Sequence, residues 1–337
     1  MHPAEALFQG MHQPVSLPVC DHYAGSEKLM RKSVALQQQL GPVFDITLDA
    51  EDGAATGNEA SHAQLIASII NSEDNRFDRI GARIHDRRHA FFEQDIALLC
   101  QNAAKRLAYL VVPKINDIAD ARHVIERINQ HAQQAGRDAL PIHLLIETHG
   151  ALADVHAIAA LPQVECLSFG IMDFVSEHHG AIPGNAMRSP AQFTHGLVVR
   201  AKLEIAAACH AHGKVPSHNV TTEIKDMAIV ANDAYRAATE FSYSRMWSIH
   251  PNQIKPILHA MSPRNGEINQ AALIISEARN AQWGPIQHNG VLHDRASYRY
   301  YWMILKRAKL SGMAIPDWVN TLLQYECTTT PKTLLCK

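Results

Sequence analysis

The chain alternates short apolar runs with longer segments in which apolar residues recur at helical spacing. This alternation is typical of βα units whose strands join one parallel sheet. Eight runs are expected to form strands, near residues 14–20, 43–49, 79–85, 107–113, 142–147, 164–170, 214–218 and 243–249.

The segments between these runs predict helices that would cover the sheet. They span residues 27–40, 62–71, 91–103, 119–135, 151–160, 192–212 and 222–238. Eight strands with intervening helices close most naturally as a (β/α)8 TIM barrel. No Gly-x-Gly-x-x-Gly or P-loop stretch follows a strand, which counts against an open nucleotide-binding sheet.

The predicted domain organisation has three parts. Residues 1–260 are expected to form the TIM-barrel catalytic domain. Residues 261–326 contain helical patterns at about 267–282 and 296–312, and we expect a helical C-terminal extension there. Residues 327–337 have the composition of a flexible tail.

Composition narrows the function further. Hydrophobic residues make up 47% of the chain and charged residues 19%, and the formal net charge is −2, so a large core is expected and a nucleic-acid partner is not. No run reaches transmembrane length, and the N-terminus lacks the pattern of a secretory signal. Six cysteines without Cys-x-x-Cys spacing favour a cytoplasmic protein.

Two acids, Glu147 and Asp173, each follow an apolar run. Because the carboxyl ends of barrel strands meet on one face, these carboxylates are expected to lie close together. Mg2+ commonly takes one or two protein carboxylates and completes its shell with water and substrate oxygens. The pair therefore predicts a magnesium site.

A second acidic group follows the second expected strand. Asp45 and Asp49 share one face of that strand, and Glu51 and Asp52 lie in the loop beyond. These acids either support the metal site or serve as capping and solvated turn residues. A role as a capping or solvated turn residue explains Asp45 poorly. This residue lies on the strand itself, where an uncompensated buried carboxylate is costly.

Three basic residues at strand ends each leave two alternatives open. Arg83 suits a substrate carboxylate or an enolate oxygen, and it also suits an ion pair with the acids at 45–52. Lys114 either faces the barrel mouth or is solvated. His250 is either catalytic or forms a hydrogen bond across the barrel, and the second role is favoured.

An ordered set of short motifs follows the expected strands. The motifs are Leu48-Asp49-Ala50-Glu51-Asp52-Gly53, Ala82-Arg83-Ile84-His85, Asp95-Ile96, Pro113-Lys114, Ile146-Glu147-Thr148, Phe169 to Asp173 and Ser248 to Gln253. In order and spacing they resemble the citrate lyase β-subunit-like (CitE-like) branch of the HpcH/HpaI aldolase/citrate lyase family. The resemblance runs from about Leu17 to Ala308.

This resemblance implies a Mg2+-dependent carbon–carbon lyase that acts on an acyl-CoA such as citryl-, malyl- or citramalyl-CoA. Glu147 and Asp173 would then be the metal ligands, and Arg83 would hold the keto acid or steady the enolate. The acids Asp49, Glu51 and Asp52 would order the surroundings of the metal. The substrate would be an acyl-CoA or a hydroxy or 2-oxo acid.

The resemblance also implies an oligomer. In several relatives a neighbouring subunit lends an acid from a Gly-x-Met-x-Asp-type stretch, and Gly290-Val291-Leu292-His293-Asp294 is similar to it. Asp294 is therefore the candidate proton-transfer residue, supplied in trans within a homo-oligomer such as a trimer or hexamer.

Four positions depart from the family's pattern. They are Pro18 to Tyr23 in place of Phe-Val-Pro-Gly, His85 in place of Asn, Asn116 in place of Glu, and Ser217-His218-Asn219 in place of an Asp-Gly pair. These departures keep two alternatives open. One is a CoA-independent HpaI-type aldolase that releases pyruvate, and the other is a weakly active structural subunit of a lyase complex.

Overall fold

A computed structural model describes residues 1–11, 13–54 and 57–329, without the side chains of residues 325–329. The chain divides into two compact units. One unit comprises residues 20–261, and the other comprises residues 1–19 together with the chain from Ser262 onward. Among the described residues, no helix is long and apolar enough to cross a membrane.

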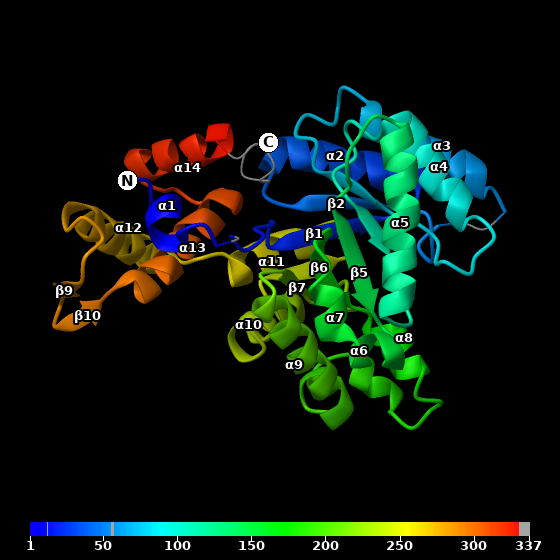
Figure 1. Cartoon of the computed structure of the whole chain (residues 1–337). Coiled ribbons are helices and arrows are strands. Elements are labelled where there is room, and N and C mark those ends of the chain that lie inside the picture. The colour runs from blue at the N-terminus through cyan, green and yellow to red at the C-terminus, as the bar shows by residue number, and fades with distance from the viewer. Residues whose placement is uncertain (12, 55–56, 330–337) are drawn as a thin grey trace. The chain divides into compact units, whose positions relative to one another are not determined.

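The larger unit is a closed barrel of eight parallel strands in sequence order, with β1 paired to both β2 and β8 (Figure 1). The predicted (β/α)8 TIM-barrel fold is thereby confirmed. The strands are β1 (Cys20–Ala24), β2 (Asp45–Asp49), β3 (Ile80–Arg83), β4 (Leu110–Val112), β5 (Ile142–Ile146), β6 (Val164–Phe169), β7 (Val215–His218) and β8 (Arg245–Ser248).

Helices follow the strands and surround them, as Figure 1 shows. Most begin within a few residues of the predicted starts. The elements are α2 (Glu27–Leu40), α3 (Glu59–Asn71), α4 (Phe92–Ala103), α5 (Ile118–Gln134), α6 (His149–Ala153), α7 (Val155–Ala159), α8 (Ile171–Ser176), the 3-10 turns η1 (Gly184–Met187) and η2 (Ala191–Phe193), α9 (Gly196–Ala211), α10 (Met227–Glu240) and α11 (Pro251–Met261).

The prediction of the first strand at residues 14–20 was wrong, because β1 begins only at Cys20. The apolar run before it contains Pro18, which has no N–H to give to a strand ladder. Polar residues occupy the true strand because they find partners inside the barrel. Asp21 accepts from Thr47 Oγ1 at 2.8 Å, and His22 Nδ1 lies 3.0 Å from Ser248 Oγ.

Ion pairs between four buried charged residues link the barrel strands. Arg245 contacts Asp45 at 2.6 Å and Asp21 at 3.0 Å, and Arg79 contacts Asp45 at 2.6 Å. All four side chains are at most 2% exposed. Two arginines thus balance two aspartates, which explains how Asp45 is tolerated on a strand in the interior.

The smaller unit has its own hydrophobic core, in which the side chains of Leu7, Phe8, Ile275, Trp302 and Leu305 are buried together. An N-terminal helix, which the sequence analysis did not predict, contributes to this core. The elements of the unit are α1 (Pro3–Phe8), α12 (Asn265–Asn280), the hairpin β9 (Ile286–His288) and β10 (Val291–His293), α13 (Arg295–Leu310) and α14 (Asp317–Thr329).

These units differ from the expected domain boundaries at two places. Residues 1–19 were expected in the barrel domain at 1–260, but they pack with the C-terminal unit because α1 buries its apolar residues against α13. The expected tail at 327–337 begins inside α14, which ends at Thr329, and residues 330–337 lie outside the described residues.

Candidate active site

A pocket of about 370 Å3 lies where the barrel strands end. Ligand sites of α/β barrels lie on this face because the βα loops converge there. Residues that close or follow most of the strands line the pocket, among them Asp49, Arg83, Glu147, Asp173, Asn219 and Ile249. The structure therefore brings the predicted metal pair and Arg83 to one pocket.

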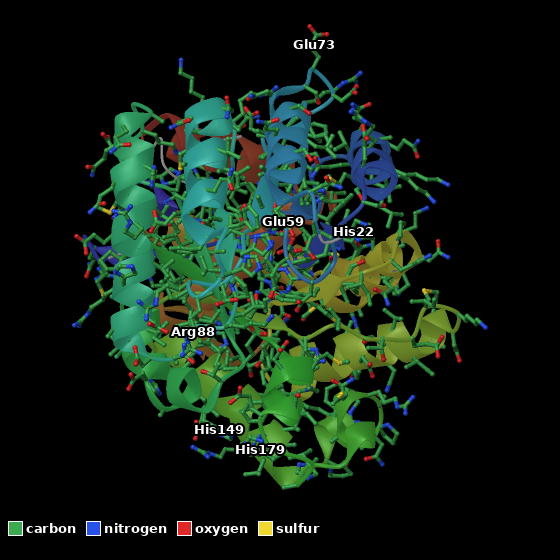
Figure 2. All side chains as sticks on the ribbon, turned by 90° about the vertical axis from the view of Figure 1, so that its right-hand side faces the viewer. His22, Glu59, Glu73, Arg88, His149 and His179 are labelled. Carbon is green, nitrogen blue, oxygen red and sulfur yellow. The ribbon has the colours of Figure 1, made fainter. Side chains whose placement is uncertain are left out.

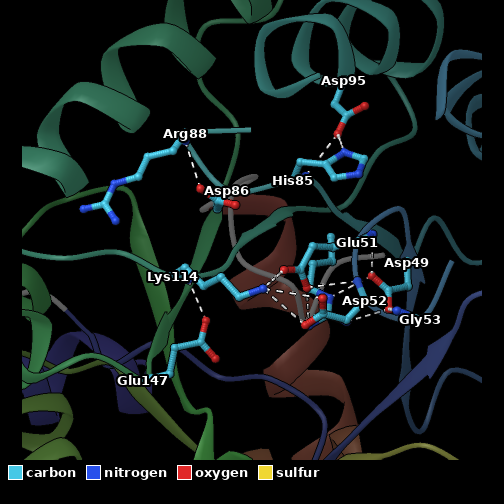
Figure 3. Close-up of polar contacts among 11 residues, drawn as sticks. Asp49, Glu51, Asp52, Gly53, His85, Asp86, Arg88, Asp95, Lys114 and Glu147 are labelled. Carbon is cyan, nitrogen blue, oxygen red and sulfur yellow. Dashed lines mark hydrogen bonds and ion pairs between the residues drawn. The ribbon is translucent and has the colours of Figure 1, made fainter. Parts of the chain in front are cut away.

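Glu147 follows β5 and is 2% exposed. Its Oε1 accepts a hydrogen bond of 2.6 Å from the backbone N–H of Lys114, whose φ of 52° is a left-handed conformation that non-glycine residues rarely adopt (Figure 3). Burial and the nearby charge of Asp173 raise the pKa of Glu147 to about 8. The negative charge of Glu147 is therefore not fully balanced by the protein groups around it.

Asp173 lies in the first turn of α8, directly after the end of β6. The backbone between them passes very close to Glu147, since a Cβ atom on Gly170 would lie 2.0 Å from Glu147 Oε2. Only glycine leaves room for that carboxylate here. The short connection Gly170 to Asp173 therefore places the second acid in the same pocket as the first, where its charge acts on Glu147.

Arg83 closes β3 and is fixed by two acids. Its Nε and Nη2 donate to Asp49 at 2.7 and 2.6 Å, and its Nη1 lies 3.0 Å from Glu51 Oε2. The predicted ion pair with the 45–52 acids is present. Two hydrogen bonds to Asp49 and the ion pair with Glu51 therefore fix the guanidinium of Arg83, which lines the same pocket as Glu147 and Asp173.

The opposing charges shift the pKa values of this group. Burial acts to raise the pKa of Asp49, but the charge and hydrogen bonds of Arg83 together with the N–H groups of Glu51 and Gly53 outweigh burial and lower this pKa. Burial raises the pKa of Glu51, although Arg83 and Lys114 oppose the shift. Asp49 and Glu51 therefore orient Arg83, and Asp45, on the same strand, lies in the interior network instead.

Lys114 joins the two acidic groups, as Figure 3 shows. Its backbone contacts Glu147, while its Nζ contacts Glu51 and lies 3.3 Å from Asp52 Oδ2. The alternative in which Lys114 is only solvated is wrong, because its side chain is ion-paired. Asp52 is 60% exposed at the side chain and belongs to the rim of the site.

Three histidines near these loops have structural partners. His85 Nδ1 lies 2.7 Å from Asp95 Oδ2 on α4, and this contact raises the pKa of His85 (Figure 3). His250 Nδ1 accepts from the backbone N–H of Asn252 at the start of α11, which is a local contact and not the expected hydrogen bond across the barrel. The ring centroids of His149 and His178 lie 4.4 Å apart, and Figure 2 labels His149 and the next histidine along the chain, His179.

Several residues that line the pocket were not among the predicted site residues, and Tyr23, Trp247 and Asn219 are the ones with aromatic or amide side chains near strand ends β1, β8 and β7. The rings of Tyr23 and Trp247 stack at 4.4 Å, and Arg83 lies 5.4 Å above the Tyr23 ring. Their positions near the ends of β1, β7 and β8 were the available signal. The misplaced first strand concealed Tyr23, and Asn219 was noted only as a departure from a motif.

The donor set fits a hard divalent cation. Among the described residues, no group of three or more His, Cys, Asp or Glu side chains is arranged to hold a metal. A cation here would be held by the Glu147 and Asp173 carboxylates and would take its other ligands from water and substrate, which is the coordination that Mg2+ prefers. The raised pKa of Glu147 agrees, because a cation would compensate the paired charges.

A (β/α)8 barrel with an acidic and arginine-lined pocket at the carboxyl ends of its strands is an enzyme architecture. The chain belongs to the HpcH/HpaI aldolase/citrate lyase family, whose sequence profile matches residues 33–250. The predicted family is thus confirmed.

Two curated relatives are lyases. The chain is 24% identical over 279 residues to an L-malyl-CoA/beta-methylmalyl-CoA lyase of Rhodobacter capsulatus, with 79% of this chain and 87% of that protein covered. It is 26% identical over 278 residues to the enzyme of the same description from Cereibacter sphaeroides, with the same coverage. Family and relatives together assign the chain to the carbon–carbon lyases of the aldolase type.

Solved structures agree with this fold. A crystal structure of a citrate lyase from Burkholderia xenovorans is 57% identical, with a TM-score of 0.82 and coverage of 96% of this chain and 99% of that one. The CitE protein of Mycobacterium tuberculosis, solved with magnesium, acetoacetate and coenzyme A, is 17% identical, with a TM-score of 0.64 and coverage of 87% and 98%.

Proposed function

We propose that the chain is a Mg2+-dependent lyase that cleaves a 3-hydroxyacyl-CoA, of the citryl-, malyl- or citramalyl-CoA kind, into a 2-oxo acid and an acyl-CoA. The observation that carries the proposal is the convergence of Glu147, Asp173 and Arg83 on one pocket. The malyl-CoA lyase relatives and the CitE protein solved with magnesium and coenzyme A support the metal and the substrate class.

The reaction breaks the bond between C2 and C3 of the acyl chain. The C3 hydroxyl loses its proton, C3 becomes the carbonyl carbon of the 2-oxo acid, and C2 becomes an enolate that takes up a proton. Magnesium held by Glu147 and Asp173 would act as a Lewis acid toward the hydroxy-acid oxygens. Arg83, oriented by Asp49 and Glu51, would bind the carboxylate of the 2-oxo acid.

Direct assays test this proposal. We expect at least one of citramalyl-CoA, malyl-CoA and citryl-CoA to be cleaved, with activity lost in EDTA and restored by Mg2+. If none of the three is cleaved with Mg2+ present, the acyl-CoA assignment is wrong. Release of pyruvate from a free hydroxy-oxo acid would then favour the CoA-independent aldolase. The sequence Pro18 to Tyr23, which differs from the family's motif at the first strand, is the observation that supports this alternative. No turnover of either kind would favour the structural-subunit alternative.

Asp294 is proposed as the proton-transfer residue, supplied by a neighbouring copy in a homo-oligomer. The residue is exposed and caps α13, where its Oδ1 accepts from the backbone of Ala296 at 2.9 Å. The hairpin before it exposes Val291 by 56% and Leu292 by 72%. Such an exposed apolar tip is typical of a surface that docks on another chain.

The rim of the pocket offers a matching apolar surface. Leu29, Met172 and Ile249 line the pocket and are 44%, 45% and 42% exposed. A hairpin from a second copy, seated on this rim, would bring its Asp294 to the reacting carbon.

The cytoplasm is the proposed location of the protein. The buried free thiols of Cys20, Cys100, Cys166 and Cys209 support it, because free cysteines persist in a reducing compartment.

Mixing two variants tests the transfer in trans. Asp294→Asn keeps a good helix cap but removes the acid, and Glu147→Gln removes a metal ligand, so each alone is expected to be inactive. Co-expression of the two is expected to restore about one site in four in a randomly mixed oligomer. Activity that stays at the level of the single variants, in an oligomer confirmed by light scattering, would contradict supply in trans.

A further inference from the structure

The active-site pocket is rich in acids and poor in cations. Among the described residues that line it, Arg83 is the one cationic side chain, and it already contacts Asp49 and Glu51. The carboxylates of the lining are those of Asp49, Asp52, Glu147 and Asp173. A magnesium ion would balance the last two. The described lining therefore offers a binding group for one ligand carboxylate, and a second ligand carboxylate would find no cation there.

Four packed residues form an apolar wall of the same pocket. Tyr23, Leu145 and Trp247 belong to one buried cluster, and Val220 packs against it. All four residues line the pocket. The Tyr23 hydroxyl and the Trp247 indole nitrogen are themselves buried. Because these two polar atoms are closed off, the surface that Tyr23 and Trp247 offer to a ligand is ring carbon.

The apolar wall lies next to the group that would bind the substrate carboxylate. The rings of Tyr23 and Trp247 stack with their centroids 4.4 Å apart, and the guanidinium carbon of Arg83 lies 5.4 Å from the centroid of the Tyr23 ring. In the proposed function Arg83 binds the carboxylate of the hydroxy acid, and the hydroxyl-bearing carbon is bonded directly to that carboxylate. The remaining substituent of this carbon is therefore within reach of the Tyr23 ring.

The chemistry of the wall favours a hydrocarbon as that substituent. Each methylene that leaves water for an apolar surface raises affinity by about a factor of four. A carboxylate in the same place would lose its hydration without gaining a cation or a hydrogen-bond donor, which is costly. The faces of the aromatic rings also carry partial negative charge, and this charge repels an anion.

We propose that the hydroxyl-bearing carbon of the substrate carries a hydrocarbon substituent, methyl or larger, which packs on the apolar wall, and that Tyr23 and Trp247 determine this specificity. The inference rests on the proposed function and narrows its substrates. Citramalyl-CoA, which carries a methyl group at this carbon, and homologues with longer alkyl groups fit the wall. Citryl-CoA, which carries a second carboxylate there, does not fit it.

Two 2-oxo acids of similar shape test the inference without turnover. Oxaloacetate ends in a carboxylate and 4-methyl-2-oxopentanoate ends in an isopropyl group, so the two acids differ mainly in charge. Their affinities for the Mg2+-loaded protein are measured by calorimetry with freshly dissolved acids. The hydrocarbon acid is expected to bind about tenfold or more tightly than oxaloacetate. Equal or tighter binding of oxaloacetate, or no binding of the hydrocarbon acid, would overturn the inference.

Trp247→Leu tests the wall itself. Leucine keeps the apolar character but removes ring surface, so the preference for the hydrocarbon acid should fall about four- to fifteenfold, the effect of one to two buried methylenes. A variant that is only less stable would weaken both acids alike. Trp318→Leu, the same change in the smaller unit, is the control and should leave both affinities unchanged. An unchanged preference in Trp247→Leu would overturn the role of Trp247.

Turnover separates failure of this inference from failure of the proposed function. The kcat/KM for citramalyl-CoA is expected to exceed that for citryl-CoA about a hundredfold or more, the effect of one uncompensated buried charge. Comparable cleavage of citryl-CoA would overturn the inference and leave the lyase assignment intact. If no acyl-CoA is cleaved but the preference for the hydrocarbon acid still depends on Trp247, the lyase assignment fails and the specificity of the wall stands.

Discussion

Replacing Glu147 by glutamine is expected to lower kcat/KM by about a thousandfold or more. A metal that acts as a Lewis acid contributes several kcal/mol to the transition state, and each 1.4 kcal/mol is about a factor of ten in rate. Glutamine keeps an oxygen for the N–H of Lys114 but removes the charge that holds the cation. Steady-state kinetics and a Mg2+ titration by calorimetry measure both effects.

The stability of the metal-free variant separates this loss from misfolding. The raised pKa of Glu147 means that its charge opposes folding as the pH rises toward 8. Glutamine resembles the protonated acid at every pH, so Glu147→Gln without metal should be at least as stable as the wild type at pH 8. Glu177→Gln, on an exposed residue at the end of α8, is the control and should keep full activity. A Glu147→Gln enzyme with normal Mg2+ affinity would contradict the assignment of the metal site.

Replacing Arg245 by methionine is expected to destabilise the barrel by about 3–5 kcal/mol. The change leaves Asp21 and Asp45 without the arginine that contacts both, and removing one partner of a buried ion network has a cost of this order. Denaturant unfolding at neutral pH measures the loss. Arg200→Met breaks an exposed pair with Glu204 and should change stability by no more than about 1 kcal/mol.

The pH dependence of the Arg245→Met variant gives a second check. Burial raises the pKa of Asp21, and Arg245 opposes that shift in the wild type. Without the arginine this pKa should rise further, so Asp21 contributes most favourably at low pH, where it is protonated, and loses that contribution as pH rises. The deficit relative to the wild type should therefore shrink as pH falls. A deficit below about 1 kcal/mol at neutral pH would show that the network does not stabilise the barrel.

Much of the candidate site followed from local sequence pattern. Seven of the eight strand positions were predicted closely, because each of them carries apolar or β-prone residues between stretches of loop or helical pattern. Strand ends of a barrel share one face, so Glu147, Asp173 and Arg83 could be expected together without any knowledge of their contacts. An ion pair of Arg83 with one of the acids at 45–52 was predicted as an alternative for the same reason.

Other features depended on partners far away in the chain. The first strand was misplaced because Asp21 and His22 look unlike strand residues until Thr47 and Ser248 are brought beside them. Asp45 meets Arg245 across 200 residues of sequence. The packing of residues 1–19 with the C-terminal unit likewise depends on helices more than 250 positions away.

The sequence by itself determined the barrel, the face of the site and the kinds of side chain present there, since periodicity and strand ends are local properties. The tertiary structure alone decided which atoms are engaged and which are free. Arg83 is held in place because Asp49 accepts two of its hydrogen bonds and Glu51 forms an ion pair with its Nη1. Asn219 Nδ2 donates to Gln192 Oε1, and Gln192 Nε2 donates to Asp233 Oδ2, so these contacts orient both amides. Which group donates and which accepts is determined by contacts in space, and the spacing of residues along the chain does not determine it.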